Sequence, residues 1–446
     1  MQKPLLLFLT VLFTISFSNL NAQLQFYSEQ NSGVTSSLTS VSMDNSTPSR
    51  VWVCGDGGVV LKTTNSGNNW LNVSNGLPNG LNLVTISSRA LDTVLTAGNM
   101  GTTTYVYRTQ NGGTNWTQVF TQANGHINAI WMISMTQGFM VGNPVGGRWS
   151  LWKTNNSGLN WDSTGLYLPQ SGSETGWNNS LAIVYNTIWF GTNNTRIYKS
   201  TNIGISWTYA TTPEQKSTAV WINLDTTSNT FAYSGGNNVY YTTSGGVNWT
   251  QISCPDTGSF KAFSPITPGV ENFPPWESIA IRGNTKVYYS GNGVGPFTVD
   301  YTAPSGIYNH MAYNRVTFPG YTWAVRSNGG ITKIQLFRGG AVRKISSEIP
   351  KDFYLNQNYP NPFNPTTKIK FEIRSPLNPL LAKEGTLVSI KIYDILGKEV
   401  TTIVNEQLKP GTYEVEWDGS NYPSGLYFYK LITGDHSETK KMIMLR

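Results

Sequence analysis

The sequence has 446 residues, which is enough for one large repeat domain with a smaller companion, or for two or three ordinary domains. Glycine, aromatic residues and Asn, Thr and Ser are plentiful, while charged residues make up only 12%, a composition typical of short strands joined by tight turns. It argues against a disordered chain and a helical bundle. The net charge of +7 comes from dispersed Lys and Arg without a basic run, so we expect no nucleic acid partner.

The first 22 residues have the pattern of an export signal. Lys3 precedes an apolar run from Leu5 to Phe17, and the segment ends at Ala22. The run is shorter than the ~20 residues that span a bilayer. We therefore interpret residues 1–22 as a cleaved signal peptide and expect no integral membrane segment.

A short motif then returns five times, each time ended by a tryptophan. Its pattern is Thr/Ser-x-Asn/Ser-x-Gly-x-Asn/Ser-Trp, and the five tryptophans are Trp70, Trp116, Trp161, Trp207 and Trp249. A period of about 45 residues is typical of repeated supersecondary units. Within each unit we place the motif at the hairpin between the third and fourth strands, where Gly supplies a positive φ and the Thr or Ser hydroxyl bonds the turn backbone. We expect the tryptophan to bury its ring between adjacent units.

Two further units complete the array. The segment Ala232–Tyr241 matches Ala280–Tyr289, which sets a sixth unit in register, with Phe297 in place of the tryptophan. A seventh unit follows, because Trp323–Gly330 resembles Trp52–Gly58 of the first. Seven units of four strands predict an all-β fold, a seven-bladed β-propeller.

The seventh unit lacks the motif and therefore needs an outer strand from elsewhere. Leu24–Gly33 resembles a fourth strand such as Trp116–Gly125, so we predict that the mature N-terminus closes the ring and removes its exposed edge. Ala341–Ile345 is the rival for that position.

The repeated motifs resemble the Asp-box of sialidase-like and photosystem II assembly-factor-like β-propellers, although no copy keeps the Asp. In those families the box is structural, so the resemblance implies a fold and no catalytic residue. The units also place Cys54 and Cys254 four blades apart, too far for the ~6 Å Cα separation of a disulfide, so we expect two free, buried thiols.

The last hundred residues read as a separate β domain. The proline-rich stretch Phe353–Thr367 cannot be a central strand. Alternating strands follow at Val388–Tyr393, Gly411–Trp417 and Gly425–Leu431, which predicts a small Ig-like β-sandwich. We assign residues 23–345 to the propeller, 346–357 to a linker and 358–446 to this sandwich.

This domain closely resembles the type A sorting domain of the type IX secretion system. The resemblance rests on Asn358–Pro365, Ile392–Lys398, Pro423–Tyr427 and the terminal Lys440–Arg446, with an insertion at Ser375–Gly385. It implies export across the outer membrane, with the type IX secretion machinery as a partner, and a protein that is secreted or attached to the cell surface.

Propeller ligands usually meet the face opposite the motif hairpins, and there the connection from Thr164 to Trp177 is the longest. The residues that we predict to form a ligand site on this face are Arg148, Trp149, Tyr167, Glu174, Trp177, Glu214 and Lys216. Flat aromatic rings beside charged groups suit a sugar or a peptide. The alternative is that these residues only pack their own loops. We place His126 and His310 near the central channel, and Trp276, in the loop from Pro265, as a lid over the motif face.

A binding or interaction module outside the cell, with a carbohydrate or protein ligand, is the function that the sequence favours. The alternative is a glycoside hydrolase of sialidase or xyloglucanase type, for which Glu174 and Glu214 are the one candidate carboxyl pair, since these enzymes need two carboxyls about 5 to 10 Å apart. A purely structural surface protein is the third possibility. We predict no catalytic residue, no metal site, because neither histidine has ligand spacing around it, and no cofactor.

Overall fold

The computed structural model describes residues 24–445 apart from 44–46, 48, 89–91, 214–218, 223–230, 266–277, 292–293, 314–319, 338–341, 347, 376–385, 420–421 and 435. The predicted signal peptide lies outside this part of the chain. The chain divides into two compact units, which meet near residue 337 in the sequence. Among the described residues both units consist of strands. One 3-10 turn, η1 (Asp56–Gly58), lies between two strands of the propeller.

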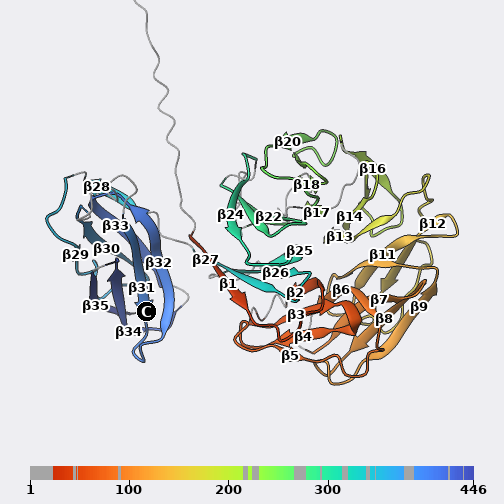
Figure 1. Ribbon diagram of the computed structural model, residues 1–446, viewed down its shortest axis with the longest axis horizontal. Coiled ribbons are helices and arrows are strands. Elements are labelled where there is room, and N and C mark those ends of the chain that lie inside the picture. The colour runs from red at the N-terminus through yellow and green to blue at the C-terminus, as the bar shows by residue number, and fades with distance from the viewer. Residues whose placement is uncertain are drawn as a thin grey trace, which may run out of the picture. The chain divides into compact units, whose positions relative to one another are not determined.

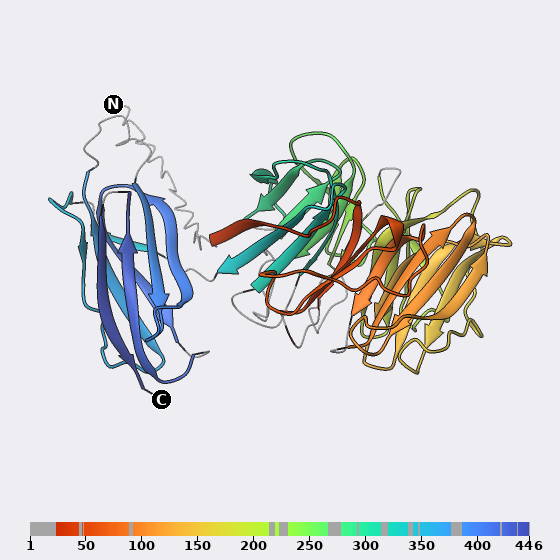
Figure 2. The same ribbon diagram turned by 60° about the horizontal axis from the view of Figure 1, so that its bottom comes forward.

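The first unit is a seven-bladed β-propeller, whose sheets are arranged in a ring (Figures 1 and 2). Blade 1 contains β2 (Leu38–Met43), β3 (Val51–Gly55), β4 (Val60–Thr63) and β5 (Leu71–Asn72). Blade 2 contains β6 (Asn82–Ser88), β7 (Val94–Met100), β8 (Thr103–Thr109) and β9 (Thr117–Ala123). Blade 3 contains β10 (Ile127–Met132), β11 (Gly138–Val145) and β12 (Arg148–Thr154). Blade 4 contains β13 (Gly176–Val184), β14 (Thr187–Thr192), β15 (Arg196–Ser200) and β16 (Thr208–Thr211). Blade 5 contains β17 (Ala219–Ile222), β18 (Ala232–Gly235), β19 (Val239–Thr242) and β20 (Thr250–Ile252). Blade 6 contains β21 (Phe260–Pro265), β22 (Ser278–Arg282), β23 (Lys286–Ser290) and β24 (Thr298–Thr302).

The N-terminal strand closes the ring, as predicted. Blade 7 has the order β1 (Leu24–Gln30), β27 (Ile331–Phe337), β26 (Gly320–Arg326), β25 (Tyr308–Tyr313), so its outer strand comes from the start of the chain (Figure 1). Glu29 of β1 forms an ion pair with the buried Arg326 and accepts hydrogen bonds from Tyr301 and Thr332. The rival segment forms β28 (Arg343–Ser346), which pairs with a strand of the second unit.

The five motifs adopt one hydrogen-bonded turn. In every copy the first hydroxyl accepts a hydrogen bond from the motif glycine's amide at 2.8–3.0 Å. The side-chain oxygen of the third residue accepts one from the amide four residues later at 2.9–3.0 Å. That bond needs only an acceptor oxygen, which Asn and Ser supply as well as Asp. The loss of Asp from all five copies therefore leaves the turn intact.

Each motif also joins its blade to the preceding one. The glycine of the second motif, Gly113, has a φ of +89°, and a Cβ placed on it would lie 2.7 Å from Val73 of blade 1. The indole Nε1 of Trp116 donates to the Val73 carbonyl at 2.8 Å. Equivalent contacts bring Trp70 to Trp323 of blade 7 and Trp207 to Phe139 of blade 3. Positive φ and close approach together explain why this position is glycine in every copy.

A second set of contacts between blades involves cations on third strands. Lys62 of blade 1 donates to the Gly112 carbonyl of blade 2 at 2.8 Å, and Arg108 of blade 2 donates to the Ser157 carbonyl of blade 3 at 2.7 Å. Lys333 of blade 7 reaches blade 1 in the same way. These cations therefore hold the motif turns of neighbouring blades.

The two cysteines are free, as predicted, but only one is fully enclosed. Cys54 is buried, and burial raises the pKa of its thiol to about 12. Cys254 is only partly buried, which corrects the expectation of two buried thiols. The difference follows from position, because Cys54 lies in the central strand β3 of its blade, whereas Cys254 follows the outermost strand β20.

The second unit is a small Ig-like β-sandwich of two four-stranded sheets. Their orders are β28, β33 (Gly411–Asp418), β30 (Thr366–Ile373), β29 (Tyr354–Leu355) and β32 (Glu399–Leu408), β31 (Thr386–Tyr393), β34 (Gly425–Ile432), β35 (Ser437–Met444). Alternate residues of the strands form one core that includes Phe371, Ile390 and Tyr429. The segment that the sequence suggested as a linker contains β29, and the insertion at 376–385 lies outside the described residues.

Candidate functional site

The inner strands of five blades share a register that sets the wall of the channel. In β2, β6, β10, β21 and β25 a bulge skips one residue near the start of the strand, so that Ser40, Thr85 and His310 take equivalent places. In β13 the pairing jumps from Gly176↔Thr192 to Leu181↔Phe190, so four residues lie where β6 has two, between Asn82↔Asn99 and Thr85↔Ala97. Blade 4 therefore carries two extra residues at the start of its inner strand, on the face opposite the motifs.

The extra residues cross the channel. Asn179 has a φ of +61°, and its amide nitrogen donates to the carbonyls of Thr39 and Val84 at 3.3 and 3.2 Å. Its Oδ1 accepts a hydrogen bond from Ser40 at 3.0 Å. One side chain of blade 4 is thus bonded to blades 1 and 2 on the far wall. Beside it, Asn178 is bonded to His126 at 2.9 Å and to Asn128 at 3.2 Å, so hydrogen-bonded amides lie at this end of the channel.

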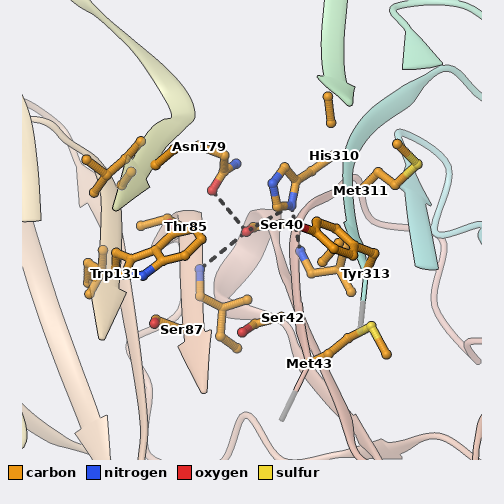
Figure 3. Close-up of a pocket in the computed structure, with 18 of the residues that line it drawn as sticks. Ser40, Ser42, Met43, Thr85, Ser87, Trp131, Asn179, His310, Met311 and Tyr313 are labelled. Atoms are coloured by element: carbon orange, nitrogen blue, oxygen red, sulfur yellow. Dashed lines mark hydrogen bonds between the residues drawn. The ribbon is translucent and has the colours of Figure 1, made fainter. Parts of the chain in front are cut away.

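A cavity of about 200 Å³ lies in the channel on the motif side of these residues (Figure 3). Its described wall runs from the level of Ser40 and His310 to the motif-face ends of the inner strands, Met43 and Tyr313. Other residues of the wall are Ser42, Thr85, Ser87, Ser88, Trp131, Met132, Asn179 and Met311. The cavity therefore has a polar floor at Asn179 and, toward the motif face, a wall of methionine, aromatic and serine side chains.

The floor of the cavity is polar and uncharged. The Val41 amide donates to Nδ1 of His310 at 3.1 Å, which requires that this nitrogen carry no proton and leaves the ring hydrogen on Nε2. Burial lowers the pKa of His310 to about 4, so the ring is neutral at physiological pH. Among the described residues that line the cavity none is a carboxylate, and Lys261 is the one cation. Its ammonium lies 5.9 Å from the ring of Trp177.

The structure scatters the residues predicted for the opposite face. Trp149 is 2% exposed and packs against Phe190 and Tyr198, with ring centroids 4.8 and 5.7 Å apart. Glu174 is 1% exposed and accepts hydrogen bonds from Tyr198 at 2.7 Å and Arg196 at 3.2 Å. Neither side chain meets solvent, which is the packing alternative that the sequence left open.

The remaining predicted residues lie apart from these two. Arg148 and Tyr167 are exposed, and the void that Arg148 lines measures about 20 Å³, room for about one water molecule. Trp177 is partly buried in the blade 4 bulge. Glu214 and Lys216 lie outside the described residues, as does the lid predicted at Trp276. None of the five predicted residues that the structure describes is among the described residues that line the central cavity.

Sequence reasoning placed His310 near the channel but missed Ser40, Trp131 and Asn179. Trp131 lies in an inner strand, where a tryptophan is expected to be a buried core residue, yet 37% of it is exposed. An alignment of inner strands would have shown the two extra residues before Leu181, and this is the signal that could have found the floor of the cavity.

The fold defines a seven-bladed β-propeller joined to an Ig-like sorting domain, with its cavity on the axis of the ring. The chain belongs to the family described as Photosynthesis system II assembly factor YCF48, whose model matches residues 25–258. Residues 357–445 match the Secretion system C-terminal sorting domain. The protein is therefore exported by the type IX system and is extracellular or attached to the cell surface. Among the described residues no helix is long and apolar enough to cross a bilayer.

Solved structures agree with the fold. YCF48 from Cyanidioschyzon merolae is 14% identical, with a TM-score of 0.54 over 69% of this chain and 98% of that chain. YCF48 bound to D1 peptide is also 14% identical, with a TM-score of 0.53 over 69% and 96%. The GH74 xyloglucanase from Xanthomonas campestris is 11% identical, with a TM-score of 0.50 over 78% of this chain and 59% of that chain. No curated protein sequence matches the chain.

Proposed function

We propose that the propeller is an extracellular binding module whose ligand is a protein, recognised on the face that carries the motif turns. The observation that carries this proposal is a set of exposed apolar side chains on that face of three consecutive blades. They are Met135, Leu159, Tyr185, Ile205 and Val247, with exposed fractions of 66, 50, 61, 66 and 79%. Leu159, Ile205 and Val247 take the same motif position, which is Asn68 in blade 1 and Thr114 in blade 2. The apolar residues are thus a local departure from the repeat, as expected of an interaction surface.

Turn geometry supports the placement of all five on one face. The motif turns bond the loops between first and second strands of their own blades, as between Ser157 and Thr136 at 2.8 Å and between Ile203 and Asn186 at 3.0 Å. Met135 and Tyr185 belong to those loops. The structural neighbour YCF48 bound to D1 peptide gives a precedent for peptide recognition by a propeller of this fold.

The carbohydrate and hydrolase alternatives have less support. A glycosidase needs two available carboxyls, and Glu174 is enclosed by its bonds to Tyr198 and Arg196. The likeness to the GH74 xyloglucanase concerns the fold alone. A carbohydrate ligand remains the second reading through Tyr167 and Trp177, which belong to the opposite face.

The proposal is tested by selecting binders to the purified mature protein from a displayed peptide library. We expect Ile205→Asp with Val247→Asp to weaken the selected binders at least tenfold, because charges would interrupt the apolar surface. Tyr167→Asp is the matched control, an exposed aromatic residue on the other face, and should leave binding unchanged. Binding that survives the double variant, or that is lost with the Tyr167 variant, would contradict the proposal. A glycan array with a signal abolished by Trp177→Ala would favour carbohydrate, and xyloglucan hydrolysis lost in Glu174→Gln would favour the hydrolase.

A further inference from the structure

We infer that the central cavity is an anchor pocket for one uncharged aromatic side chain that bears a hydroxyl group, a tyrosine of the bound protein, inserted from the motif face. The inference rests on the proposed function and specifies its chemistry. It follows from the direction in which the cavity extends, its volume, the composition of its wall and the hydrogen-bonding groups of its floor.

The direction follows from the blade 4 bulge. Asn179 is bonded to Thr39, Ser40 and Val84 across the channel, and this closes the cavity toward the face opposite the motifs. The described wall ends at the last residues of the inner strands, including Met43 and Tyr313. A ligand group would therefore enter from the same face that carries the exposed apolar side chains.

The volume suits a single ring. The cavity measures about 200 Å³, below the ~300 Å³ at which pockets for drug-sized ligands begin. An apolar cavity of ~150 Å³ in another protein holds benzene, so one substituted ring fits here. The depth of the cavity also suits one ring, because the three residue steps from Ser40 to Met43 span about 10 Å at ~3.3 Å per residue.

The wall is suited to an aromatic ring. Trp131 turns part of its indole toward the cavity, and Met43, Met311 and Tyr313 lie on the opposite side (Figure 3). Aromatic pairs and sulfur–aromatic contacts each stabilise a ring beyond the effect of area alone. Because Trp131 is 37% exposed on an inner strand, it has ring surface available for a ligand.

The floor matches a hydroxyl group, which donates one hydrogen bond and accepts another. Ser40 gives its own hydrogen to Asn179, and its oxygen accepts the Ile86 amide at 3.4 Å, so one lone pair of the hydroxyl is left as an acceptor. His310 accepts from Val41 at Nδ1, so Nε2–H is a donor. A cation would find no carboxylate in the described wall, and an anion would find only Lys261, whose ammonium lies 5.9 Å from the centre of the Trp177 ring and whose pKa is lowered by burial.

The first experiment measures the pocket without a partner protein. Calorimetric titration of the full mature chain compares 4-methylphenol with toluene, 4-methylbenzoate and 4-methylbenzylamine. We expect 4-methylphenol to bind about tenfold tighter than toluene, the factor of one neutral hydrogen bond, and the two charged probes not to bind. Ser40→Ala and His310→Leu should each reduce the preference over toluene, and Trp131→Ala should weaken both neutral probes. Tyr167→Ala is the control that changes neither. Equal binding of toluene and 4-methylphenol, or tighter binding of a charged probe, would overturn the inference.

The second experiment separates this inference from the proposed function. Peptides selected on the motif face are resynthesised with each tyrosine replaced by phenylalanine and by alanine. Loss of about tenfold with phenylalanine and more with alanine supports an inserted tyrosine. Binders that depend on Ile205 and Val247 but tolerate both replacements would overturn the anchor pocket and leave the binding module standing. Selective binding of 4-methylphenol without any peptide ligand would overturn the proposed function instead.

Discussion

His310 should titrate far below an ordinary histidine, and the effect on stability can be worked out. Its pKa is lowered from 6.5 to about 4, chiefly by burial, and the Val41 amide bonds only the unprotonated Nδ1. In the unfolded chain His310 binds a proton below pH 6.5, whereas in the native protein it binds one only below about pH 4. At about 1.4 kcal/mol per pH unit, His310 alone removes about 3 kcal/mol of stability as the pH falls through this interval. Above pH 6.5 the contribution is constant.

The measurement is direct because the chain has only three histidines. Labelling the histidine rings with 13C at Cε1 gives three resonances by NMR, and the one missing from His310→Gln identifies His310. We expect it not to titrate down to pH 5. Urea denaturation of both proteins should show that the wild type loses stability faster than the variant between pH 6.5 and 5. A His310 resonance that titrates near pH 6.5, or parallel stability curves, would refute the reasoning.

Three more predictions concern the ring. Gly113→Ala should destabilise the propeller by about 3 kcal/mol, because the alanine would have both a positive φ and a clash with Val73. Gly101→Ala is the control and should cost about 1 kcal/mol, because Gly101 has a φ of +59° and nothing within 4 Å. Equal thermal shifts of the two variants would contradict this prediction. A thiol reagent should modify Cys254 in the native protein and Cys54 only on unfolding, because burial raises the Cys54 pKa to about 12; two reactive thiols by mass spectrometry would disagree. Glu29→Ala should lower stability by about 2 kcal/mol in urea because it leaves Arg326 buried without its carboxylate, and an unchanged midpoint would show that β1 is not needed.

Local rules were enough to predict the blades. The turn at Gly67 or Gly113 is specified by eight adjacent residues, so its repetition gave both the period and the position of the hairpin. The strand at Leu24–Gln30 could be placed in blade 7 because the repeat left one position empty. Phe297 is 1% exposed, which agrees with its reading as the tryptophan substitute of blade 6.

The site could not be predicted from local rules. Trp149 and Glu174 look like surface groups of a long loop, and only their contacts with Tyr198 in the next blade show that they are buried. The cavity depends on the register that five inner strands share and on the two extra residues that bring Asn179 across the channel. A sequence without an aligned relative gives no sign of such a shift.

The closure of blade 7 decides where the ring bears mechanical load. Its outer strand β1 is the first of the propeller and lies against β27, the last, after which the chain continues into the sorting domain. Tension applied between the start of β1 and the segment that follows β27 would act on this single seam. Six blades would then stay unstressed, and a tethered propeller would fail first where its two ends are joined.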